Sequence, residues 1–406
     1  MASNPPLAPR GQRSAIEVAP LRQRRNRRGG FAIWWREIDR TLLVLVLVLM
    51  AIGTVAVAAS SPASARRLST ARIRLDDLHF FYIHLRWQML GVIALFGASM
   101  LSRETARRVG IVLGFAMLAG LLLVPVIGFS VNGAQRWINV GVSLQPSEFL
   151  KPAFAIMMAW ILSWRVRDPH LPVIELCTGL MGGIAILLMT QPDFGSTILF
   201  AGVWFVMVLM SGISLKRIGL AGGFGAVGVG LAYMFYENAR HRIDAFLGGG
   251  TAYDQVDLAQ RTLTAGGWTG SGLWLGTKKL GLPEAHTDYI FSVIGEEFGL
   301  IACAVIVALY LLVVARVMLR LLDEEDLFTA LAAAGLTAQL GGQAFINIMV
   351  NLQLFPSKGM TLPLISYGGS STIAICLGLG LLLAITRRNP FIRRERLSLK
   401  QLGLGK

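Results

Sequence analysis

Ten stretches of about 20 mostly apolar residues follow one another along the chain, and they constrain its fold more than any other feature. A helix that crosses the hydrocarbon core of a bilayer needs roughly 20 such residues. The sequence therefore predicts an all-α polytopic membrane protein with about ten transmembrane helices. The predicted segments are residues 41–59, 84–101, 108–128, 147–164, 173–190, 194–212, 215–236, 290–315, 327–351 and 364–386.

Positive charge is concentrated in two short segments outside these stretches. Of a net charge of +15, residues 1–40 contribute +6 and residues 387–406 contribute another +6. Lys and Arg accumulate on the cytoplasmic side of membrane proteins. Both termini are therefore predicted to be cytoplasmic, which agrees with an even number of spans. The segregation argues against a nucleic-acid-binding domain with a basic face, and three cysteines inside apolar runs argue against a disulfide scaffold.

The charge pattern predicts a basic tail at 1–40, a transmembrane domain at 41–386 and a second basic tail at 387–406. The longest connection, about 237–289, is predicted to be a large extracytoplasmic loop between the seventh and eighth helices. Long loops usually carry function, and we expect short helices in this one. One connection conflicts with the charge rule, because residues 60–83 are predicted to be external although they contain four Arg.

Polar residues gather at the predicted extracytoplasmic ends of the helices, where they are candidates for function because they are costly near a membrane. One cluster contains Arg136 and continues to Glu148 and Lys151. The last two share a helix face, so a simple local ion pair is the alternative to a functional role. In a second cluster Asp193 is placed to cap the sixth helix.

A third cluster begins at Asp288, where the long loop re-enters the membrane. A partly desolvated carboxylate suits general-base chemistry, and the alternative from sequence alone is a cap of the eighth helix. Glu296 and Glu297 follow about two turns later. At least one of them is expected to face protein or water and not lipid.

The fourth cluster spans residues 355–371. Lys358 can meet a phosphate as a point charge. The Gly-Gly-Ser-Ser run that follows allows close approach of backbone or of helices. In the same cluster, Ser366 and Ser370 are further candidates for substrate binding. No metal-binding or nucleotide-binding motif appears in the sequence.

The candidate cations of the outer side surround one candidate base, Asp288. This arrangement suits an anionic substrate that is held in the membrane, such as a lipid pyrophosphate. The positive-inside rule does not explain cations on the predicted outer side. They are Arg136, Lys151, Lys278 or Lys279, and Lys358.

The sequence around these residues resembles the SEDS family of bacterial shape, elongation, division and sporulation proteins. The resemblance covers about residues 40–390, and it is closer to the cell-division branch than to the elongation branch. Phe355 and Ser357 depart from the family pattern, and Tyr289 replaces the usual Phe. The matching segments are GAQRW, QPSEFLK, QPDFGS, PEAHTDYIFSVIGEEFG and SKGMTLPLISYGGSS.

The resemblance implies a peptidoglycan glycosyltransferase that polymerises lipid II in the bacterial inner membrane, at the division septum. It implies that Asp288 is the essential aspartate and that Arg136, Glu148, Lys151 and Lys358 are functionally important. The implied partners are lipid II and undecaprenyl-pyrophosphate-linked glycan, a class B penicillin-binding protein and other divisome proteins. Whether a divalent cation, Mg or Mn, joins the pyrophosphate stays open.

Two other functions are alternatives, a lipid II flippase and a non-catalytic divisome scaffold. A flippase needs polar groups through the membrane midplane. The centres of the predicted spans are nearly free of ionisable residues, which favours the enzyme. A scaffold alone leaves Asp288 at the mouth of the membrane without a reason.

Overall fold

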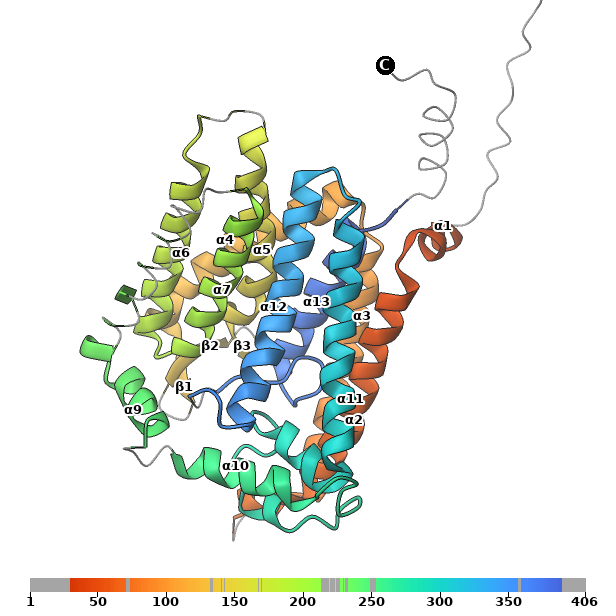
Figure 1. Ribbon diagram of the computed structural model, residues 1–406, viewed down its shortest axis with the longest axis vertical. Coiled ribbons are helices and arrows are strands. Elements are labelled where there is room, and N and C mark those ends of the chain that lie inside the picture. The colour runs from red at the N-terminus through yellow and green to blue at the C-terminus, as the bar shows by residue number, and fades with distance from the viewer. Residues whose placement is uncertain are drawn as a thin grey trace, which may run out of the picture. The chain divides into compact units, whose positions relative to one another are not determined.

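The computed structural model describes residues 30–70, 74–131, 134–139, 141, 143–166, 168, 170–212, 219, 223, 227–228, 230, 233–248, 253–356 and 359–388. The chain divides into two units, Met1–Arg36 and Glu37–Lys406. Helix α1 (Gly30–Glu37) lies almost entirely in the first. The second is a helical bundle with a small three-stranded sheet (Figure 1).

The helices of the second unit carry the labels of Figure 1. The 3-10 helices are η1 (Trp164–Val166) and η2 (Lys278–Gly281). The α-helices are α2 (Arg40–Leu68), α3 (His79–Ser99), α4 (Arg103–Ile127), α5 (Pro146–Ser163), α6 (Val173–Thr190), α7 (Phe194–Met210), α9 (Glu237–Phe246), α10 (Tyr253–Ala265), α11 (Ile290–Leu321), α12 (Leu327–Asn351) and α13 (Gly369–Ile385).

Helices α2 to α7 and α11 to α13 coincide in position with nine of the ten predicted segments, within the part of the chain that the structure describes. The remaining segment, 215–236, lies largely outside the described residues. Among the described residues, six helices are apolar and long enough to cross a membrane, namely α2 to α6 and α11. Helices α7 and α13 are apolar but shorter, with 17 residues each.

Helices α5 and α12 form the centre of the bundle. Helix α5 packs against α4, α12 and α13, and α12 also packs against α7 and α11. Two-thirds of the α5 span (67%) is buried, compared with 22% for α3 and α4. The outward side chains of the outer helices are apolar, for example Ile93 and Val112. Lipid-facing helices require an apolar exposed face, because polar side chains are costly in hydrocarbon.

Short acidic side chains begin several helices. Asp39 accepts a hydrogen bond from the amide of Leu42 at 3.2 Å, and Asp193 accepts one from Ser196 at 3.1 Å. Each satisfies an N–H that the first turn of a helix leaves without a partner. The predicted capping role of Asp193 is confirmed.

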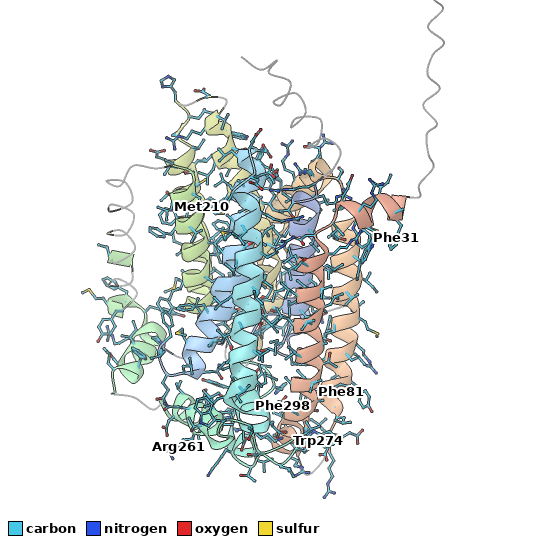
Figure 2. All side chains as sticks on the ribbon, turned by 45° about the vertical axis from the view of Figure 1, so that its right-hand side comes forward. Phe31, Phe81, Met210, Arg261, Trp274 and Phe298 are labelled. Atoms are coloured by element: carbon cyan, nitrogen blue, oxygen red, sulfur yellow. The ribbon has the colours of Figure 1, made fainter. Side chains whose placement is uncertain are left out.

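The elements predicted to be extracytoplasmic gather at one end of the bundle (Figure 1). Figure 2 shows Arg261, Trp274 and Phe298 at this end and Met210 at the other. The sheet pairs β1 (Phe129–Val131) with β2 (Ala134–Asn139), and β2 with β3 (Ser143–Leu144), all antiparallel. The short helices expected within 237–289 are present as α9, α10 and η2.

Two of the arginines that conflicted with the charge rule make protein contacts at this end. Helix α2 continues to Leu68, beyond its predicted span. Arg67 donates a hydrogen bond to the carbonyl of Gly281 at 3.0 Å, and Arg66 lies 3.6 Å from Asp77. Arg67 therefore joins the 237–289 segment to α2, and Arg66 lies beside the connection that follows α2.

Helix α11 is broken at Gly299, which the sequence analysis did not predict. Gly299 has φ +84° and ψ 172°, a conformation that side chains other than hydrogen strongly disfavour. The backbone groups on both sides of the break bond to the loop 267–272, with N···O distances of 2.8–3.2 Å. The first part of α11, which follows Asp288, is therefore a separate half-helix.

Candidate active site

Asp288 is half-buried and lies two residues before Ile290, the first residue of α11. The N-cap position of α11 is Tyr289, which makes no side-chain capping bond. The structure thus places Asp288 directly before the N-cap position of α11. Its carboxylate lies beside the loop after α12, since an ideal Cβ placed on Gly359 would be 3.4 Å from Asp288 Oδ2.

Three amide side chains of α12 hold this region together. Gln343, Asn347 and Asn351 are spaced four residues apart and so share one helix face. Asn347 and Asn351 donate to the Asp288 carbonyl at 2.8 and 3.2 Å, and Asn347 also donates to the Met360 carbonyl at 2.6 Å. The sequence analysis missed these amides, although their i, i+4, i+8 spacing was a visible signal.

Ser366 also binds the segment that contains Asp288. Its hydroxyl donates to the Thr287 carbonyl at 2.6 Å and accepts from the amide of Leu362 at 2.8 Å. Ser370 is half-buried in the first turn of α13. Lys358 lies outside the described residues, next to Gly359 in the chain.

Arg136 lies on β2 and binds the turn between α6 and α7. Its Nε donates to the Gln191 carbonyl at 2.9 Å, and a second guanidinium nitrogen donates to the Pro192 carbonyl. Arg136 is half-buried. A guanidinium offers five N–H donors, so these two bonds use only part of its capacity.

The turn that Arg136 binds is itself attached to α4. Pro125 lies inside α4 and has no N–H for the carbonyl of Leu121, four residues earlier. The Gln191 side chain donates to that carbonyl at 3.0 Å. A proline inside one helix thus provides the attachment point for the next part of the site.

Glu148 and Lys151 form an ion pair of 2.7 Å in the first turns of α5. Both are buried, with exposures of 9% and 2%. The second carboxylate oxygen of Glu148 makes no hydrogen bond within the part of the chain that the structure describes. The pair expected from the sequence is therefore present. It is buried, and the second carboxylate oxygen of Glu148 lacks a hydrogen-bond partner among the described residues.

The predicted site residues that the structure describes thus fall into three sets. Asp288 and Ser366 share one set of contacts, Arg136 joins the 191–192 turn, and Glu148 pairs with Lys151. Lys279 belongs elsewhere, in a buried network with Glu297. Among the described residues, no three His, Cys, Asp or Glu side chains are grouped to hold a metal ion.

An aromatic cluster adjoins the Asp288 segment. The His286 ring lies 4.3 Å from Phe80 and 5.2 Å from Tyr367, measured between centroids. Burial lowers the pKa of His286 to about 4, and nearby Glu284 opposes the shift. His286 is therefore neutral at neutral pH.

These features define a class of protein: a multi-pass helical membrane protein with a carboxylate and buried charged groups gathered at one end of its bundle. The chain belongs to the family described as "Cell cycle protein" (FtsW, RodA and SpoVE), whose model matches residues 39–390.

Curated relatives and solved structures agree with this membership. The chain is 35% identical over 368 residues to the probable peptidoglycan glycosyltransferase FtsW of Caulobacter vibrioides, covering 90% of this chain and 93% of the relative. The relative of the same name from Methylococcus capsulatus is 36% identical over 368 residues, covering 86% and 89%.

Among solved structures, one described as "Structural coordination of polymerization and crosslinking by a peptidoglycan synthase complex" matches with a TM-score of 0.70 and 30% identity, covering 87% of this chain and 98% of that chain. The rod shape determining protein RodA of Thermus thermophilus matches with a TM-score of 0.63 and 28% identity, covering 87% and 97%.

Proposed function

We propose that this chain is a peptidoglycan glycosyltransferase that polymerises lipid II, with Asp288 as the general base. Relatives at 35% and 36% identity carry the name peptidoglycan glycosyltransferase. One structural observation carries the residue assignment: Asp288 is half-buried and its main-chain carbonyl is bound by two amides of α12. A base on a fixed backbone is suited to proton transfer, which requires close and oriented contact.

The proposed reaction is a single displacement. The 4-hydroxyl of the GlcNAc of one lipid II transfers its proton to the Asp288 carboxylate while its oxygen bonds to the anomeric carbon of MurNAc at the end of the lipid-linked chain. The bond from that carbon to undecaprenyl pyrophosphate breaks, and the leaving group takes the electron pair. An alpha-linked donor becomes a beta-linked product, so no second carboxylate is needed as nucleophile.

The leaving pyrophosphate gains charge in this step, and cations at the same end of the bundle would stabilise it. Arg136 supports this role because its two carbonyl contacts leave other donors of its guanidinium for a phosphate. Lys151 is neutralised by Glu148, which suits a part in organising the site. We assign Lys358, Ser366 and Ser370 to the same substrate region.

The proposal includes the setting of the enzyme. We propose ten transmembrane spans with both basic termini in the cytoplasm, the 237–289 loop outside, and a location at the division septum. The proposed partners are a class B penicillin-binding protein and other divisome membrane proteins. The likeness to a peptidoglycan synthase complex that coordinates polymerisation with crosslinking supports a transpeptidase partner.

A reconstituted assay tests the proposal. The purified protein is combined with its cognate transpeptidase and labelled lipid II, and the glycan products are separated by length. The wild type is expected to make polymer and Asp288→Ala to make none, at equal amounts of folded protein. Equal polymer from both proteins would reject Asp288 as the base, and the absence of polymer from the wild type would reject the enzyme.

A further inference from the structure

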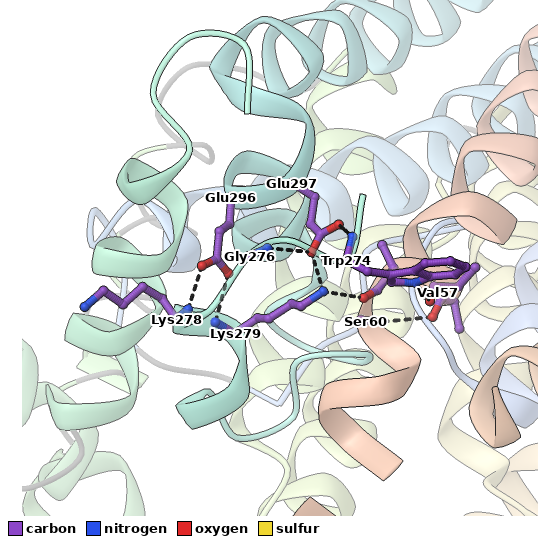
Figure 3. A network of polar contacts seen from close by, with 10 residues as sticks. Val57, Ser60, Trp274, Gly276, Lys278, Lys279, Glu296 and Glu297 are labelled. Carbon is purple, nitrogen blue, oxygen red and sulfur yellow. Dashed lines mark hydrogen bonds and ion pairs between the residues drawn. The ribbon is translucent and has the colours of Figure 1, made fainter. Parts of the chain in front are cut away.

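Two acidic residues in the first half of α11, Glu296 and Glu297, are each 1% exposed. Their carboxylates accept hydrogen bonds from the main chain of the loop that leads to Asp288 (Figure 3). A buried carboxylate is costly unless hydrogen bonds and a counter-charge compensate it. The bonded amides belong to Lys278 and Lys279 for Glu296, at 2.6 and 2.8 Å, and to Trp274 and Gly276 for Glu297.

The counter-charge comes from Lys279, whose residue is 3% exposed. Its ammonium forms an ion pair with Glu297. The same ammonium donates to the main-chain carbonyl of Ala59 in α2 at 2.8 Å. One buried cation therefore joins the first half of α11 to α2, and the loop that carries it lies between them (Figure 3).

Helix α2 can accept these contacts because it contains Pro62. Proline has no N–H, so the carbonyl of Ala58, four residues earlier, loses its helical partner, and the ring crowds that turn. The indole N–H of Trp274 donates to the Ala58 carbonyl at 3.1 Å. The Trp274 indole thus supplies the partner that Pro62 removes, as neighbouring groups do for prolines in membrane helices. The Lys279 ammonium adds a bond to the adjacent carbonyl, that of Ala59.

Asp288 follows Lys279 by only nine residues. The segment between them is held by packing and by hydrogen bonds. Leu282, Ala285 and Tyr289 are buried in an apolar cluster with residues of α11 and α12. Ser366 and the two asparagines of α12 also bind carbonyls of this segment. A shift of Lys279 would therefore be carried to Asp288.

We propose that Lys279, Glu296 and Glu297 form a latch that fixes the Asp288 loop against α2 and so positions the carboxylate for the reaction. The three act through Asp288 and are positioning residues. The inference rests on the proposed function, because the exact place of Asp288 affects the rate only if Asp288 is the base. A misplacement of about 1 Å can lower a rate by about 100-fold.

The test uses the full chain with its cognate transpeptidase, and compares Lys279→Met with the double variant Lys279→Met/Glu297→Gln. The matched control is Arg261→Met, which removes an exposed cation of α10 that pairs with Asp257. Three quantities are measured: kcat and KM for labelled lipid II, the thermal unfolding temperature, and amide hydrogen exchange of residues 282–289.

Lys279→Met is expected to lower kcat by about 10- to 100-fold with KM little changed, and to speed exchange in 282–289. The double variant should regain thermal stability, because the Glu297 carboxylate is no longer buried without its counter-charge. It should not regain kcat, since the bond to Ala59 is still missing. Arg261→Met should match the wild type in all three measurements.

Recovery of both stability and kcat by the double variant would show that the network only stabilises the fold, and would overturn the latch. Wild-type kcat in Lys279→Met would overturn it as well. An Asp288→Ala protein that polymerises normally would instead reject Asp288 as the base. The exchange measurement still tests the latch in that case, because it reads the loop without the reaction.

Discussion

The side-chain amide of Asn351 donates a hydrogen bond to the main-chain carbonyl of Asp288 at 3.2 Å. The side-chain oxygen of Asn351 accepts from both the amide and the hydroxyl of Ser292, at 3.2 and 2.7 Å. One side chain of α12 therefore binds the chain on both sides of the start of α11. The position of Asp288 depends on a helix that begins some forty residues later in the sequence.

Replacing Asn351 with Leu should lower kcat for lipid II polymerisation by about tenfold, with a loss of about 1–3 kcal/mol in stability because the Ser292 hydroxyl is left buried without a partner. Steady-state kinetics and thermal unfolding measure the two effects. Gln339→Leu is the control, since Gln339 is buried on the same helix three turns away. A wild-type kcat in a folded Asn351→Leu protein would contradict the role of this amide.

Lys151→Met should destabilise the protein by about 3–5 kcal/mol, because Glu148 would remain buried without its counter-charge. The double variant Glu148→Gln/Lys151→Met should recover most of that loss. Thermal unfolding of the three proteins measures the coupling. If the double variant is as unstable as Lys151→Met, the 2.7 Å pair is not what stabilises the start of α5.

Gln191→Leu should cost about 1–3 kcal/mol, since the carbonyl of Leu121 would lose its partner. Adding Pro125→Ala to this variant should restore part of the loss, because the new N–H at 125 can bond to that carbonyl within α4. The same unfolding measurement on Pro125→Ala alone completes the cycle. Strictly additive effects would argue against the proline-dependent contact.

Stability should fall as the pH drops from about 6.5 toward 4. Burial lowers the pKa of His286 to about 4 from 6.5, so between these values the unfolded chain binds a proton that the folded protein excludes. The full effect is about 3 kcal/mol. His286→Phe keeps a ring against Phe80 and Tyr367. In this variant the unfolding temperature should fall less between pH 6.5 and 4 than in the wild type. The same fall in unfolding temperature in both proteins would mean that other groups cause the acid sensitivity.

The helices could be predicted from the sequence because a membrane span must satisfy its own backbone, which requires a long apolar run. The cap at Asp193 and the gathering of polar residues at one end were predictable for equally local reasons. The break at Gly299 was not predictable, because the carbonyls and amides on either side of it are bound by residues 267–272. A glycine alone does not show that another segment will reach it.

The contacts around the prolines show the same limit. Pro62 and Pro125 are visible in the sequence as missing N–H groups, and the freed carbonyls follow from helix geometry. The groups that bind them, Trp274 and Gln191, are about 216 and 70 residues away from their carbonyls. Only packing of the whole bundle decides those partners.

Lys278 and Lys279 illustrate the division between sequence and structure. The sequence determined a helical membrane protein, and it predicted that either lysine could be a cation for the substrate on the outer side. The tertiary structure exposes Lys278 and buries Lys279 against Glu297 and α2. The reason is physical: composition and apolar length act locally along the chain, whereas the environment of a charge depends on which distant carboxylates and carbonyls the fold brings to it.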